Sequence, residues 1–169
     1  MRDDSEKWDV PQPIDCVHKA NGITLAPATL SRQVLFSGPS VLAQTEQPIA
    51  SWPDIVAAHS YALSIRRDRV LQVNGPAASE GWHGDTCQAV TDASDAYAVF
   101  DISGERSLEV LKRGAELSLD VPSKSVARIL FNLGVFLYRY EAETKFRIHV
   151  ASGHAEALVR SLKVAIAAS

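Results

Sequence analysis

The chain has 169 residues, of which 46% are hydrophobic, and it carries a formal net charge of -3. This apolar content suffices for a packed core, so the composition excludes a chain that is disordered throughout. The small negative charge gives no attraction to phosphate backbones, and no apolar run approaches the roughly 20 residues that cross a bilayer. We therefore expect neither nucleic-acid binding nor membrane insertion.

The amino-terminal residues 1–28 combine prolines and charges with little periodicity. Pro11, Pro13 and Pro27 interrupt any regular element, so the segment is predicted to be an extended arm that lies across a partner or a neighbouring domain. Acidic residues stand where a secretory signal would need a basic start followed by an apolar run. The sequence therefore indicates a cytoplasmic protein.

Residues 29–93 are predicted to form a small α+β subdomain. Gln33 to Gly38 is a short β-prone run that a Gly-Pro pair ends, and Ser51 to Asp54 is typical of a helix start with proline in the first turn. The runs YALSI and RVLQV flank a charged stretch, which predicts two strands joined by a polar turn. Residues 77–86 are small, polar and rich in glycine, which favours a loop.

Residues 94–169 are predicted to form a second α+β subdomain with the order β-α-β-β-β-α. Ala98, Phe100 and Ile102 share one face of its first strand, and the glycines at 104 and 114 bound a helix. The runs VARILFNLGVFLYRY and TKFRIHV then predict three consecutive antiparallel strands.

The chain is predicted to end in an amphipathic helix. Its apolar residues recur at three-and-four spacing: Ala155, Leu158, Val159, Leu162 and Ile166. This order of elements suits helices packed on one face of a mainly antiparallel sheet. We therefore assign the chain to the α+β class.

The densest group of reactive side chains is the segment from Gly81 to Cys87. His83, Asp85 and Cys87 could share a metal ion, but a structural site normally has four ligands and no second His or Cys cluster supplies the fourth. Cys16 and Cys87 lie far apart and neither belongs to a C-x-x-C pair, so both are expected to be ordinary thiols. We interpret the segment as a surface or interface loop.

The remaining candidate groups have simpler explanations than catalysis. A histidine within a strand or beside a helix start is more often partly buried or capping, and carboxylate pairs in loops are solvated. These groups are His149, His154, the pair Asp92 and Asp95, and the pair Glu141 and Glu143. The glycine motifs that hold nucleotide phosphates are absent from the sequence, so we expect no catalytic, cofactor-binding or metal-binding residue in this chain.

The carboxy-terminal half resembles the gamma subunit of heterotetrameric sarcosine oxidases. The resemblance covers the run from Ser94 to Asp120, then ARILFNLGVFLYRY and FRIHV. The family's features fall on Ser103-Gly104, Gly114, residues 117–121, Arg128 and the helix after Gly153. Two segments depart from the family pattern: Asn74-Gly75-Pro76, and the helix entry Ser152-Gly153-His154.

The resemblance implies a fold similar to part of the aminomethyltransferase, or glycine cleavage T-protein, folate domain. It also implies a non-catalytic accessory subunit that packs against the folate domain of the large alpha subunit. In such complexes the other subunits hold FAD, FMN, NAD, tetrahydrofolate and zinc. They oxidise the N-methyl group of sarcosine, pass the one-carbon unit to tetrahydrofolate and reduce oxygen to hydrogen peroxide.

Two other functions are compatible with the sequence. A stand-alone folate-binding or aminomethyltransferase-like protein would need an aromatic and a carboxylate for the pterin, for which Tyr97 and Asp101 on one strand face are the candidates. A regulatory amino-acid-binding module rests on fold-level analogy, because small α+β folds often serve that way. Dimerisation on addition of an amino acid would favour the regulatory module over the other functions.

We predict that the purified chain is colourless and free of stoichiometric metal, because it lacks phosphate-binding glycine motifs and a four-ligand cluster. Absorption spectroscopy and elemental analysis check this. A flavin spectrum, or one tightly held zinc ion per chain, would contradict it.

Overall fold

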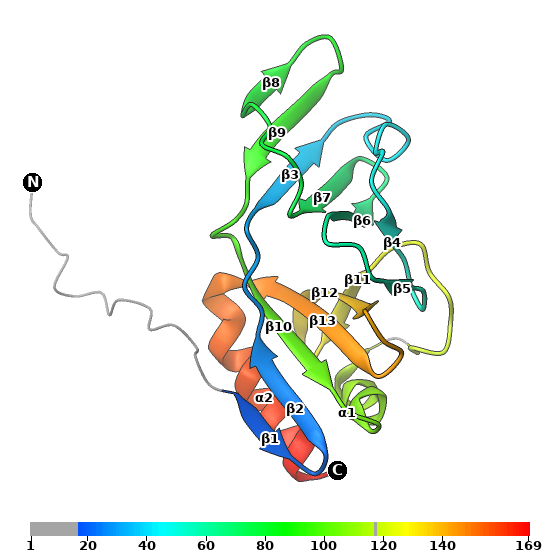
Figure 1. Cartoon of the computed structure of the whole chain (residues 1–169), viewed down its shortest axis with the longest axis vertical. Helices are drawn as coiled ribbons and strands as arrows, with labels where there is room; N and C mark the ends of the chain where they lie inside the picture. The colour runs from blue at the N-terminus through cyan, green and yellow to red at the C-terminus, as the bar shows by residue number, and fades with distance from the viewer. Residues whose placement is uncertain (1–16, 117) are drawn as a thin grey trace, which may run out of the picture.

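A computed structural model describes residues 17–116 and 118–169, which fold into two β-sheets and two short α-helices (Figure 1). The strands of the amino-terminal part are β1 (His18–Ala20), β2 (Ile23–Pro27), β3 (Gln33–Ser37), β4 (Ile49–Ala50), β5 (Ile55–Val56), β6 (Tyr61–Arg66), β7 (Arg69–Val73), β8 (Gly81–His83) and β9 (Gln88–Asp92). The carboxy-terminal elements are β10 (Tyr97–Ser103), α1 (Ser107–Gly114), β11 (Ala127–Leu130), β12 (Leu133–Tyr140), β13 (Lys145–Ala151), a 3-10 turn η2 (Ser152–His154) and α2 (Ala155–Ala167).

The larger sheet has the strand order β1-β2-β10-β13-β12-β11, with β5 added in parallel beside β12. All its other pairings are antiparallel. This confirms the strand predicted at Tyr97–Ser103 and the three antiparallel strands that follow the first helix. Phe100 and Ile102 are buried on the face predicted for them.

The smaller sheet has the order β4-β6-β7-β3-β9-β8. The predicted hairpin of β6 and β7 and the strand β3 are present, and both lie inside this sheet. The chain passes almost directly from β2 into β3 and from β9 into β10, and it crosses between the sheets again on either side of β5, which lies between β4 and β6 in the chain (Figure 1). Among the residues described, no helix is long and apolar enough to span a membrane.

The two helices share one apolar core with one face of the larger sheet. Val110 and Leu111 of α1 and Leu158 and Leu162 of α2 belong to this core together with Ile148 of the central strand. The apolar face predicted for the last helix is therefore confirmed. The other face of the larger sheet packs against the smaller sheet through a second core rich in tyrosine.

Two glycines of the carboxy-terminal pattern are required by close packing. Gly104 has a φ of 136°, and a Cβ there would collide with the carbonyl oxygen of Gly22 in the β1–β2 turn. A Cβ on Gly114 would enter the ring of Phe131, whose backbone N–H also donates to the Gly114 carbonyl. These positions fix how α1 meets its neighbours, so their role is structural.

The prediction of an extended arm at 1–28 is wrong for its second half; residues 1–16, with Pro11, Pro13 and Cys16, lie outside the described part. Residues 18–27 form β1 and β2, and β2 pairs with β10. Ile23 and Leu25 are buried in the core. The overlooked signal is Asn21-Gly22, two residues with positive φ that match a hairpin turn.

The predicted helix after Ser51 is also wrong, because this segment is extended and supplies β5, directly after β4. Trp52 is buried, its indole N–H donates to the Leu119 carbonyl at 2.8 Å, and its backbone pairs with Ser123. These tertiary contacts hold the backbone extended and override the local helix signal.

The predicted loop at 77–86 contains the short strand β8, which pairs with β9 to form a hairpin. Strand β8 has only three paired residues, and it begins with Gly81, whose φ is 113°. An alternating pattern of this length is too short to separate a strand from a loop in the sequence.

We predict that Phe100→Ala lowers the free energy of unfolding by about 3 to 5 kcal/mol and that Leu25→Ala lowers it by about 2 to 5 kcal/mol, because both truncations open cavities in one core. Urea denaturation measures both. The exposed Val121→Ala is the control and should change stability by less than about 0.5 kcal/mol. A loss below about 1 kcal/mol for Leu25→Ala would show that the amino-terminal strands are peripheral.

Candidate functional site

The three residues weighed as metal ligands lie on the β8–β9 hairpin. His83 Nε2 is 2.7 Å from the Ser79 carbonyl oxygen, and the exposed Cys87 thiol lies 3.5 Å from the Gly84 carbonyl oxygen. Asp85 is exposed in the turn between them. Within residues 17–116 and 118–169, no three His, Cys, Asp or Glu side chains come close enough together to hold a metal ion.

The paired carboxylates lie at exposed positions. Hydrogen bonds from Ser94 hold the pKa of Asp92 below its ordinary value. Asp95 lies in the following turn, where its carbonyl oxygen accepts a hydrogen bond from Ser152. Glu141 accepts from Lys145 at 2.6 Å, and Glu143 is exposed. The pairs therefore form no enclosed acid–base site.

The fully buried His149 lies at the centre of a polar network between the two sheets. Its Nδ1 is 2.8 Å from Gln33 Oε1, and its Nε2 is 2.7 Å from the Tyr138 hydroxyl. Gln33 donates both hydrogens of its side-chain amide to backbone carbonyls, so its Oε1 faces His149 as an acceptor. Nδ1 of His149 therefore carries the proton, and Tyr138 donates to Nε2.

The network continues to a charged pair. The Tyr138 hydroxyl is 2.7 Å from that of Tyr61, which accepts a hydrogen bond from Arg147 at 3.2 Å. Arg147 makes two hydrogen bonds to Asp101, at 2.7 and 2.9 Å, and its guanidinium carbon lies 3.6 Å from the centre of the Tyr140 ring. We call Gln33, His149, Tyr138, Tyr61, Arg147 and Asp101 the buried polar network.

Burial shifts the pKa values within this network. Desolvation, aided by the charge of Arg147, lowers the pKa of His149 to about 3, so the ring is neutral at physiological pH. Desolvation also raises the pKa of Tyr61 and of Tyr138. Burial alone would lower the pKa of Arg147, but the bonds to Asp101 and Tyr61 outweigh it and raise that pKa. The network therefore holds one permanent ion pair and otherwise neutral groups.

The structure does not form a pterin pocket from Tyr97 and Asp101. Both carboxylate oxygens of Asp101 accept hydrogen bonds from Arg147, and Lys145 lies 3.5 Å away. The Tyr97 ring packs on Phe136, with 5.1 Å between ring centres. Both groups already have intramolecular partners, so this pairing gives no basis for a folate site.

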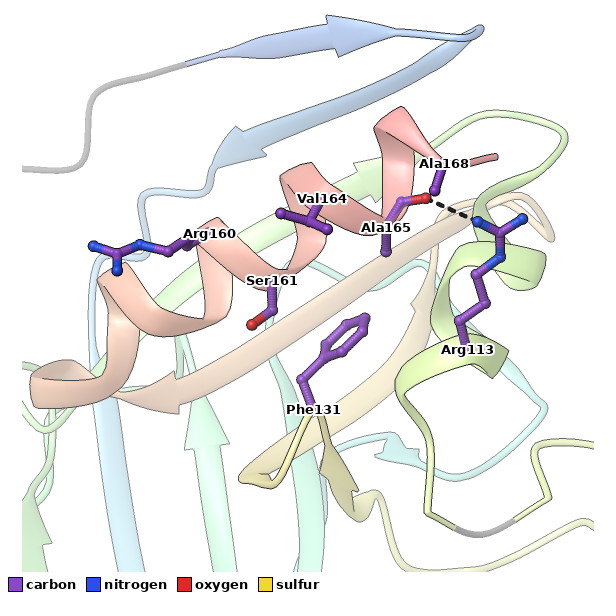
Figure 2. A pocket seen from close by; sticks show the side chains of 7 residues that line it. All are labelled: Arg113, Phe131, Arg160, Ser161, Val164, Ala165 and Ala168. Carbon is purple, nitrogen blue, oxygen red and sulfur yellow. Dashed lines mark hydrogen bonds between the residues drawn. The ribbon is translucent and has the colours of Figure 1, made fainter.

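A groove opens on the outer side of α2, toward α1 and the β11–β12 turn (Figure 2). Its volume is about 430 Å³, and its lining is mainly apolar, with Val164, Ala165 and Ala168 along α2 as the floor and the Phe131 ring as the opposite wall. Ser161 also lines it, and Arg160 and Arg113 lie toward its two ends. The groove holds no carboxylate, histidine or cysteine, so its chemistry suits binding more than catalysis.

The sequence did not identify the network or the groove. A signal for the network was available, because Arg147 and His149 alternate with the apolar residues of β13 and so share one strand face. Their partners come from strands far away in the sequence, so the face could not be assigned to an interior. The groove arises where α2 meets Arg113 and Phe131, which only the tertiary structure brings together.

Comparisons with known proteins show the fold. No family model matches the chain, and no curated protein matches it. Among solved structures, it is similar to a chain of the heterotetrameric sarcosine oxidase from Corynebacterium sp. U-96, in a complex with pyrrole 2-carboxylate. The TM-score is 0.67 at 19% identity, and the match covers 89% of this chain and 87% of the other. The resemblance found in the sequence is therefore confirmed at the level of the fold.

We predict that stability falls as the pH drops below about 6.5, because the unfolded chain then binds a proton at His149 that the folded chain excludes until a pH of about 3. The expected slope approaches about 1.4 kcal/mol per pH unit for this one proton. Urea titrations at pH 7, 6 and 5 measure it, and His149→Gln should show a smaller slope. The other histidines are common to both proteins, so equal slopes would contradict the assignment.

Proposed function

We propose that this chain is a non-catalytic accessory subunit of a sarcosine-oxidase-type complex and that it works by binding the larger enzyme chains. One observation carries the proposal: the fold match to a chain of such a complex extends over 89% of this chain. The match covers nearly equal shares of both chains, so the matched chain is of similar length. This supports the correspondence to a small subunit.

The chemistry of the described residues agrees with a binding role. The polar groups considered as metal ligands or acid–base residues are either exposed on turns or hydrogen-bonded within the buried polar network. Asp101 is neutralised by Arg147, and His149 has hydrogen-bond partners on both ring nitrogens. We infer that the chain supplies surface to the complex and no reacting group.

The finer assignments follow from the sequence resemblance. We propose that the chain corresponds to the gamma subunit, lies in the cytoplasm and contacts the folate domain of the alpha subunit. In this proposal the other chains hold FAD, FMN, NAD, tetrahydrofolate and zinc. Those chains demethylate sarcosine or a related N-methyl amine and transfer the one-carbon unit to tetrahydrofolate.

We predict that the chain, co-expressed with the matching alpha, beta and delta chains of a sarcosine-oxidase-type complex, co-purifies with them in a fixed ratio and that the assembled material carries flavin. Size-exclusion chromatography with absorption detection, followed by intact-protein mass spectrometry, measures both. An unrelated tagged protein of similar size serves as the control. Recovery of this chain alone, with flavin only in fractions that lack it, would contradict the proposed function.

A further inference from the structure

We propose that the groove along α2 is the anchor point for a partner chain and that it receives an acidic segment with apolar side chains at its centre. This inference deepens the proposed function, on which it rests, by naming the surface and the chemistry of its occupant. The occupant is a segment of the larger enzyme chains.

The floor of the groove is shaped for apolar side chains. Val164 projects from the outward face of α2 with 67% of its surface exposed, whereas the other face of this helix is buried in the core. Ala165 and Ala168 leave room beside it, and the Phe131 ring closes the opposite wall (Figure 2). A volume of about 430 Å³ is within the range of specific binding pockets.

The ends of the groove carry positive charge that faces outward. Arg113 donates one N–H to the Ala165 carbonyl at 3.2 Å, which fixes the guanidinium at this end while its other donors stay available. Arg160 forms an ion pair with Glu156 at 2.8 Å, and because both side chains are exposed this pair is weak and leaves the guanidinium able to meet a second carboxylate. Guanidinium groups bind carboxylates in two-point geometry, so the two ends favour acidic residues on either side of an apolar centre.

The same charges argue against a second copy of this chain as the occupant. A symmetric contact of two such grooves would bring each arginine near its counterpart, and like charges at an interface oppose association. An acidic segment of another chain matches both the floor and the ends. Seven residues line the groove, whereas a standard interface uses about 20 to 30 residues per side, so the groove would anchor a wider contact.

Competition during assembly tests the inference in the intact complex. Wild-type chain and a variant, distinguished by tag, are co-expressed with the larger chains, and the ratio incorporated is read by mass spectrometry. Val164→Asp places a carboxylate in the apolar floor and should be incorporated at least about tenfold less than wild type. Val121→Asp is the matched control, since Val121 is 61% exposed and lies outside the groove, and it should compete within about twofold of wild type.

Further variants separate the parts of the inference. Val164→Lys should be incorporated several-fold better than Val164→Asp, because a lysine can pair with an acidic partner. Equally reduced incorporation of Val164→Lys and Val164→Asp would show that the occupant is not acidic. Thermal melting of each free variant verifies that it folds.

Each remaining outcome points to one conclusion. Equal incorporation of Val164→Asp and wild type would overturn the groove as the interface while leaving the proposed function intact. If Trp82→Asp were incorporated less than wild type while Val164→Asp were incorporated normally, the interface would lie on the β8–β9 hairpin, where Trp82 is exposed. That result would also overturn the inference. A wild-type chain that joins no complex would overturn the proposed function itself.

Discussion

The buried polar network between the two sheets is the constraint on which the rest of the fold depends. Along β13, Phe146, Ile148 and Val150 face the helix-side core, while Arg147 and His149 face the smaller sheet. A slip of one residue in strand pairing would turn the charged and polar side chains into the apolar core and leave Asp101 without its partner. The network therefore fixes the strand register, and with it the face on which both helices pack.

Sequence patterns predicted those elements whose periodicity is long or whose ends carry glycine. β10, the hairpin β6–β7 and α2 fall in this class, because a strand of alternating residues or a helix of three or more turns repeats its pattern enough to be recognised. The elements that were not predicted are either short or held by tertiary contacts. β2 has five residues and a terminal proline, and β4 and β5 have two residues each and depend on the burial of Trp52. Two glycines of the pattern on which the resemblance rests hold close positions, since a Cβ on Gly104 would collide with backbone and one on Gly114 would displace the Phe131 ring.

The structure separates buried polar groups that stabilise the chain from apolar side chains that remain exposed on its surface. Inside, the side chains of the buried polar network are matched to one another between the sheets, and its histidine is neutral with a hydrogen-bond partner on each ring nitrogen. Outside, apolar side chains remain exposed at Val164 and Trp82. In the proposed function, this division lets the chain offer a surface to a flavoenzyme complex without taking part in its chemistry.

Turnover of the assembled complex tests this central claim most directly. Oxygen consumption with sarcosine is measured for complexes that contain His83→Ala, Asp85→Asn or Cys87→Ser, the reactive side chains of the exposed hairpin, and for this chain alone. The account predicts no activity in the isolated chain and turnover within a few fold of wild type in each assembled variant. A loss of about 10² to 10⁴, typical of a missing acid–base group, in a complex that remains intact would contradict it.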